Sequence, residues 1–257
     1  MALKTYSFQR WINILTFAAT IIINGLAGSA RLIGGKTTAE VSDSFPTLIT
    51  PAGYVFSIWG VIYVLLGVFM VYQALPSQKN NRFQEKVGWL FALSNLLNIF
   101  WIFLWHFGQL VLSVILMTLI FLDLILIYLR LQTVKTGVST LEKIAVHLPF
   151  SVYLGWITIA SIANFAAMLV SVRWDGFGIS SEIWAVLIII VATCVTVLVL
   201  ATKRDIPYSL VVVWALLGIA VAQGKTQIVV VTSEFCTFLI ILTIAIIIFS
   251  KKLRKSP

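Results

Sequence analysis

Long runs of apolar residues separated by short polar segments dominate this chain of 257 residues. A helix needs about 20 mostly apolar residues to cross a bilayer. Eight runs reach or approach that length, the seventh being the shortest: residues 10–30, 53–75, 87–107, 109–130, 144–172, 182–202, 207–223 and 227–250. The alternating apolar and polar pattern typical of barrel strands is absent. The sequence therefore predicts an all-α integral membrane protein, a multi-span helical bundle of about eight transmembrane helices.

Composition and charge agree with this fold class and place the termini. The chain is 60% apolar and 11% charged, whereas soluble domains carry about 25% charged residues. The net charge of +9 does not indicate a nucleic-acid partner, because 14 of the 18 Lys and Arg residues fall on one side of the expected helices. Such an excess marks the cytoplasmic side. We therefore expect both termini in the cytoplasm and the protein in the cytoplasmic (plasma) membrane.

Two segments outside this regular pattern need interpretation. The first apolar run follows Lys4 and Arg10 and ends in small residues, as in a signal peptide. We expect it to be retained, because it is long and the charge distribution fits an even number of helices. Residues 29–52 form the longest polar segment, on the non-cytoplasmic side. A loop of that length suggests a lid or binding loop, the alternative being a solvated connector.

The third expected helix carries polar and indole side chains on one face. At 100° per residue, Asn95, Asn98, Trp101, Trp105 and His106 fall on the same side. Polar groups on a membrane helix usually point into the bundle or a cavity rather than at lipid. We therefore expect this face to line the interior, with Asn98 and Trp101 as the functional candidates and Asn95 and His106 as packing residues.

Two further helices present aromatic faces. The second groups Phe56, Trp59, Tyr63, Gly67 and Met70 on one side. Rings beside a glycine can wall a slot, and the alternative is ordinary helix packing through Gly60 and Gly67. The fifth groups Tyr153, Trp156, Ala160, Ala163, Asn164 and Ala167. Its alanines permit close approach of neighbouring helices, whereas Tyr, Trp and Asn supply polar tips.

These segments resemble a known family. Residues 51–63, Pro-Ala-Gly-Tyr-Val-Phe-Ser-Ile-Trp-Gly-Val-Ile-Tyr, resemble the Pro-Pro-Gly-Trp-Val-Phe…Trp-Thr-x-Leu-Tyr segment of the TspO/MBR family. These are the tryptophan-rich sensory proteins, related to the mitochondrial translocator protein or peripheral benzodiazepine receptor. Residues 97–108 are similar to the family's Leu-Asn-x-x-Trp…Phe-Phe-Gly, and residues 153–164 to its Tyr-Leu-x-Trp…Asn. The resemblance covers about residues 10–172.

The chain departs from the family pattern at three places. The loop Trp before the proline pair is missing, and the first proline is replaced. The acidic residue Asp123 lies several residues later than the family's aspartate in the fourth helix. The family has five helices, and this chain adds about three. We therefore expect a TspO/MBR-like five-helix membrane domain over residues 1–172 and an additional three-helix membrane segment over residues 173–257.

The resemblance implies a pocket under the first loop, lined by the second, third and fifth helices. The family's ligands are tetrapyrroles such as protoporphyrin, sterols and other hydrophobic molecules. The expected ligand-binding residues are Trp59, Tyr63, Asn98, Trp101, Tyr153, Trp156 and Asn164. No cofactor is required, although porphyrin or haem could be the ligand. The expected partners are membrane lipid and a hydrophobic small molecule, with a homodimer left open and no nucleic acid.

The remaining ionisable residues indicate an alternative function. Asp123 and Glu234 lie within expected helices, so a proton- or ion-coupled secondary transporter is the alternative function. Structural pairing of Asp123 with Arg130, and of Glu234 with Lys225, is the competing interpretation. His106 and His147 are expected to be satisfied interfacial residues rather than haem ligands. No nucleophile–base pair or metal spacing indicates an enzyme.

Overall fold

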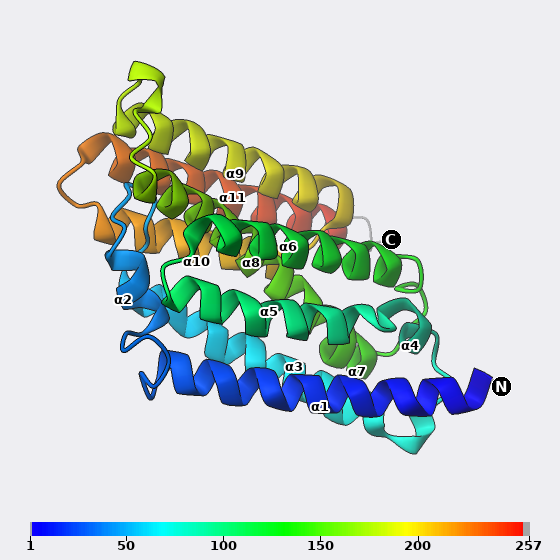
Figure 1. Ribbon diagram of the computed structural model, residues 1–257. Helices are drawn as coiled ribbons and strands as arrows, with labels where there is room; N and C mark the ends of the chain where they lie inside the picture. Colours follow the sequence, from blue (N-terminus) through cyan, green and yellow to red (C-terminus); the bar gives the residue numbers. More distant parts are fainter. Residues whose placement is uncertain (1, 254–257) are drawn as a thin grey trace.

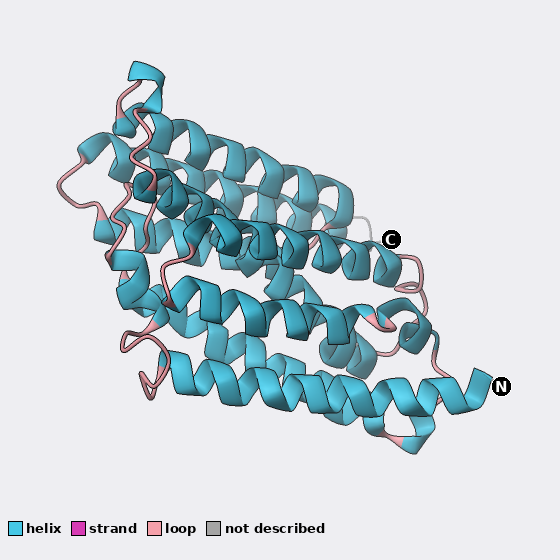
Figure 2. Cartoon of the chain, viewed as in Figure 1, coloured by secondary structure: helices cyan, strands magenta, loops and turns pink. Residues whose placement is uncertain are grey.

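The computed structural model describes residues 2–253, and in that range helices are joined by loops and turns with no strand (Figure 2). Helices account for 81% of the chain. The membrane helices are α1 (Ala2–Gly28), α3 (Ile58–Ala74, preceded by η1, Gly53–Ser57), α5 (Leu90–His106), α6 (Leu110–Gln132), α8 (Leu148–Ser171), α9 (Ser181–Lys203), α10 (Ile206–Ala222) and α11 (Gln227–Leu253). Short helices connect them: α2 (Thr38–Asp43), η2 (Pro76–Gln78), α4 (Arg82–Val87), α7 (Thr140–Glu142), η3 (Lys143–His147) and η4 (Gly176–Gly178). Each expected run coincides with one membrane helix.

The prediction of a multi-span helical membrane protein is therefore confirmed. Six of the described helical segments are long and apolar enough to cross a bilayer. The two shorter apolar helices, α5 and α10, have 17 residues each. At 1.5 Å per residue they are about 26 Å long, slightly less than a hydrocarbon core of about 30 Å.

Consecutive helices run antiparallel, so both ends of the chain lie at the same end of the bundle (Figure 1). Helix α5 packs between α1 and α6, while α8 contacts α3, α6 and α10. Every residue of α8 from Pro149 to Ile159 is buried. A helix that is apolar all round and buried on every side forms the centre of a bundle, so α8 connects the first helices to α9–α11.

Glycines permit close helix approach at two positions other than the expected ones. A Cβ atom at Gly155 would lie 2.8 Å from the carbonyl oxygen of Tyr208 on α10. A Cβ atom at Gly218 would lie 2.1 Å from Cγ2 of Val55 in η1. At Gly60 and Gly67 a Cβ atom would have nothing within 4 Å. The alternative of close helix packing through Gly60 and Gly67 is therefore wrong, because no atom of a neighbouring helix lies close to either Cβ position.

The long first loop is folded over one end of the bundle. Its helix α2 begins with a capping box, in which Thr37 and Glu40 exchange side-chain and backbone hydrogen bonds. The backbone N–H of Thr37 and the nearby Arg31 guanidinium, 2.7 Å from the carboxylate, lower the pKa of Glu40 below its ordinary value. Helix α2 contacts α5 and η1. The loop thus has its own local structure and lies against the residues that begin α3.

Candidate functional site

An aromatic cavity lies beneath α2, between α3, α5 and α8. Its volume is about 30 Å³. The lining residues are Thr38, Ser42, Pro51, Phe56, Trp59, Trp101, Trp105, Trp156, Ile159, Ala160, Ala163 and Asn164. The small side chains of Ala160 and Ala163 leave room on the α8 side, whereas indole rings form most of the other walls.

Trp59 is the centre of the ring cluster. Its ring centroid lies 5.6 Å from that of Tyr63 and 6.0 Å from that of Trp101. On α8, the rings of Tyr153 and Trp156 lie 6.0 and 6.1 Å away, both edge-on to Trp59. Aromatic pairs at centroid distances of about 4.5–7 Å attract one another beyond simple burial. Three helices are therefore joined through a single half-buried indole.

The indole N–H groups of this cluster differ in what they bind. Trp101 donates to Asn164 Oδ1 at 2.9 Å, and Asn164 donates in turn to the hydroxyl of Ser113 on α6 at 2.8 Å. Trp105 donates to the carbonyl oxygen of Thr38 in α2 at 3.2 Å. Trp156 is only 2% exposed, and its Nε1 has no hydrogen-bond partner among the described residues. A buried donor left unpaired is costly, so this atom stands out.

A second polar group lies behind the cavity. Asn24 on α1 donates to Oδ1 of Asn98 at 2.7 Å. The Nδ2 atom of Asn98 and the hydroxyl of Tyr63 are buried without a partner among the described residues. Both carboxylate oxygens of Asp123, on α6, are also unpartnered there. Unpaired polar atoms from α3, α5 and α6 thus gather in the bundle interior.

The structure brings the seven expected residues together but divides them into two layers. Trp59, Trp101, Trp156 and Asn164 line the cavity, while Tyr63, Asn98 and Tyr153 lie outside its lining. Eight further lining residues were not selected from the sequence as binding residues: Thr38, Ser42, Pro51, Phe56, Trp105, Ile159, Ala160 and Ala163. Phe56, Trp105 and the two alanines were on the identified helix faces, so their periodicity was a usable signal. Thr38 and Ser42, in the first loop, had no signal in the sequence pattern.

The expected supporting residues partly behave as anticipated. Asn95 donates to Thr16 Oγ1 at 3.3 Å and so joins α5 to α1. His106 and His147 are buried, and the Nε2 atom of each is unpartnered among the described residues. His106 is partly satisfied, because its Nδ1 atom lies 2.8 Å from the carbonyl oxygen of Ile102.

The part of the chain that the structure describes shows no direct ion pair for either carboxylate within the helices. Asp123 is buried and forms no direct pair with Arg130, although the charge of Arg130 acts on it. Glu234 on α11 is exposed and forms no direct pair with Lys225 among the described residues.

A family model described as TSPO-like protein matches residues 10–248. The chain belongs to this family. No curated protein and no solved structure matches the chain significantly. The family match extends past residue 172 through α9, α10 and most of α11.

In this TSPO-like protein, α10 supports the segment that carries the pocket. The backbone N–H of Ala52 donates to the carbonyl oxygen of Gly218 at 3.0 Å. The indole of Trp214 donates to the carbonyl oxygen of Val55 at 3.1 Å and packs edge-on against Tyr54. These contacts fix η1, which contains Phe56, and the start of α3, which carries Trp59.

Proposed function

We propose that this TSPO-like protein binds a hydrophobic or tetrapyrrole ligand in the aromatic cavity beneath α2, in a sensory or transport role. The unpartnered N–H of Trp156, set in a wall of indole rings, is the observation that carries the proposal. Flat amphipathic ligands stack on aromatic rings and need a small number of placed polar groups to fix their orientation. Trp156 offers such a donor, and Asn164 lies in the same lining.

Ligand entry requires the cavity to open. Ligand sites have volumes of about 300–1,000 Å³, whereas this cavity measures about 30 Å³. Helix α2 covers it with only six residues, and the Trp105–Thr38 hydrogen bond ties that helix to α5. Displacement of α2 breaks this hydrogen bond between α2 and α5 and exposes the ring cluster. We therefore propose that the first loop is the lid of the pocket.

Binding rather than catalysis suits the chemistry of the lining. Its polar members are hydroxyl, amide and indole groups, and it contains no Asp, Glu, His or Lys. A hydroxyl without an adjacent base is a weak nucleophile. The cavity can therefore recognise a ligand but has no general base with which to transform it.

The test is a titration of the purified protein with protoporphyrin, followed by quenching of tryptophan fluorescence. Trp156→Phe keeps a ring but removes the unpaired donor, and we expect it to weaken binding about five- to tenfold, the value of one hydrogen bond. Trp59→Ala removes the central ring and should weaken binding further. The matched control is Trp174→Phe, because that ring packs with Phe177 and Trp184 outside the cavity.

Unchanged affinity in both pocket variants would overturn the assignment. Equal losses in the control and the pocket variants would show that quenching reports a general property of the protein. Isothermal titration calorimetry with the same ligand separates these outcomes, because it does not depend on the number of indoles.

A second function, proton- or ion-coupled transport, is favoured by Asp123 alone. Its carboxylate is buried on α6 with both oxygens unpartnered among the described residues. Buried carboxylates inside membrane proteins often carry protons or cations. The test uses proteoliposomes that contain a pH-sensitive dye. If the protein transports protons, the dye should report proton movement in the unmodified protein and none in Asp123→Asn. The control Asp43→Asn, in the exposed first loop, should keep proton movement unchanged.

A further inference from the structure

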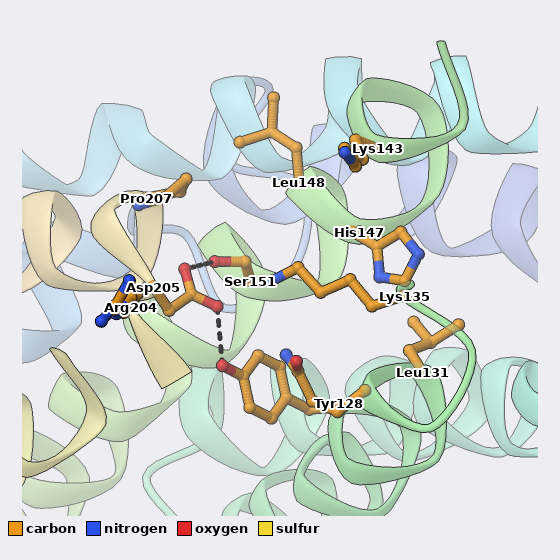
Figure 3. Close-up of a pocket in the computed structure, with 11 residues that line it drawn as sticks. Tyr128, Leu131, Lys135, Lys143, His147, Leu148, Ser151, Arg204, Asp205 and Pro207 are labelled. Carbon is orange, nitrogen blue, oxygen red and sulfur yellow. Dashed lines mark hydrogen bonds between the residues drawn. The ribbon is translucent and has the colours of Figure 1, made fainter. Parts of the chain in front are cut away.

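A second cavity (Figure 3) lies at the opposite end of the bundle, where α1 begins and α11 ends (Figure 1). Its volume is about 160 Å³. It is bounded by the end of α6, the segment that follows it, η3, the start of α8 and the turn between α9 and α10. This end also carries the excess of Lys and Arg in the sequence. The cavity is therefore distinct from the aromatic pocket in position and in chemistry.

Three cationic side chains from three separate segments line this cavity: Lys135 after α6, Lys143 in η3 and Arg204 at the end of α9. In Figure 3 the ammonium group of Lys135 extends toward Ser151. None of these three cations forms an ion pair among the described residues. Lys143 and Arg204 are exposed and Lys135 is half-buried, so their charges are available to a ligand at the mouth of the cavity.

The one carboxylate in the lining, Asp205, is occupied by neutral donors. It is 3% exposed and accepts hydrogen bonds from the hydroxyls of Tyr128, at 2.7 Å, and Ser151 (Figure 3). It also accepts the backbone N–H of Tyr208, 3.2 Å away, at the start of α10. This carboxylate organises the floor of the cavity and offsets one of the three cations, so the lining keeps a net positive charge.

His147 supplies an independent sign of a missing partner. It lines the same cavity, is 8% exposed, and its Nε2 atom is unpartnered among the described residues. It lies close enough to Lys135, Lys143 and Asp205 to interact with their charges. A buried imidazole nitrogen without a partner is normally explained by a water or a ligand. Here it can donate to an anionic oxygen or accept from a protonated one.

We propose that this cavity binds a phosphate group, presented by an anionic phospholipid or by a soluble phosphate. Three cations and an imidazole around one small space suit a compact anion that accepts hydrogen bonds in several directions. The volume of about 160 Å³ has room for several water molecules and so for a phosphate group. Basic pockets between transmembrane helices on this side of a membrane bind lipid headgroups, so the lipid arm of the test comes first.

The experiment measures binding to the full-length protein in a nonionic detergent by calorimetry. The probes are dioctanoyl phosphatidic acid, inorganic phosphate and, as the zwitterionic control, dioctanoyl phosphatidylcholine. The cavity variant combines Lys135→Gln, Lys143→Gln and Arg204→Asn. Asparagine is chosen because Arg204 has a left-handed backbone, with φ of 52°, which asparagine tolerates. The charge-matched control combines Lys79→Gln, Arg82→Gln and Lys86→Gln, which also lie on the basic side but outside the cavity.

We expect the cavity variant to weaken phosphatidic acid binding by at least about tenfold and the control to change it less than about twofold. Binding of phosphatidic acid alone identifies a lipid headgroup site, and parallel loss of inorganic phosphate binding identifies a site open to solution. Equal affinity in the two variants, or equal binding of phosphatidylcholine, overturns the proposal. If the triple variant does not fold, Lys135→Gln is measured alone. Weaker binding of phosphatidic acid then supports the proposal, and unchanged binding overturns it.

Discussion

Buried amides act at the residue scale as connectors between helices. Asn164 accepts from Trp101 and donates to Ser113, so one side chain links α5, α8 and α6. Asn24 and Asn98 link α1 and α5 in the same way. In lipid, where apolar contact with a neighbouring helix is little better than contact with acyl chains, such bonds help to define which helices are neighbours.

Replacing Asn164 with leucine should destabilise the protein by about 1 kcal/mol, because two interhelical hydrogen bonds are lost and each is worth about 0.6 kcal/mol in a membrane protein. The measurement is unfolding of the purified protein in a denaturing detergent, followed by far-UV circular dichroism. Thr118→Val is the control, since that exposed hydroxyl bonds only to the carbonyl oxygen of Val114 within its own helix. Equal stability of the Asn164 and Thr118 variants would contradict a connecting role.

At the scale of elements, the contact between η1 and α10 decides how the pocket segment is held. Gly218 approaches Val55 so closely that no side chain fits between them. The backbone bond from Ala52 to Gly218 fixes the same approach. Because Trp59 follows η1 directly, a shift of this contact moves the centre of the ring cluster.

Gly218→Ala should therefore destabilise the protein by about 1–3 kcal/mol, the usual cost of overpacking. Its new methyl group would lie 2.1 Å from a methyl of Val55, whose β-branched side chain has little freedom to move away. Gly67→Ala is the matched control, since nothing lies within 4 Å of its Cβ position. Detergent unfolding and the protoporphyrin titration are both informative. Unchanged stability and affinity in Gly218→Ala would show that α10 does not hold the pocket segment.

At the scale of the whole molecule, the two candidate sites lie at opposite ends of one bundle. The aromatic cavity is covered by the first loop, and the basic cavity lies at the end with the termini. The charge distribution predicts that the basic end faces the cytoplasm. A hydrophobic ligand would then enter from the opposite side or from lipid, whereas phosphate would be bound at the cytoplasmic surface.

Cysteine labelling tests this orientation. In a background with Cys194→Ala and Cys236→Ala, Lys36→Cys in the first loop should react with a membrane-impermeant maleimide on intact cells. Lys79→Cys, exposed at the other end, should react only after the membrane is permeabilised. The reverse pattern would place the termini outside the cytoplasm, and labelling of both sites in intact cells would indicate mixed orientation.

The sequence by itself determined the helices and which side chains face inward. Span length and a period of 100° per residue are local properties, and they were sufficient to select Trp59, Trp101 and Trp156. The tertiary structure alone decided that Gly218 rather than Gly67 is the site of close approach, and that Thr38 and Ser42 complete the aromatic cavity. It also brought Lys135, Lys143 and Arg204 to one basic cavity. These features depend on which helices are neighbours, and in lipid that choice follows from packing and hydrogen bonds between residues far apart in the chain.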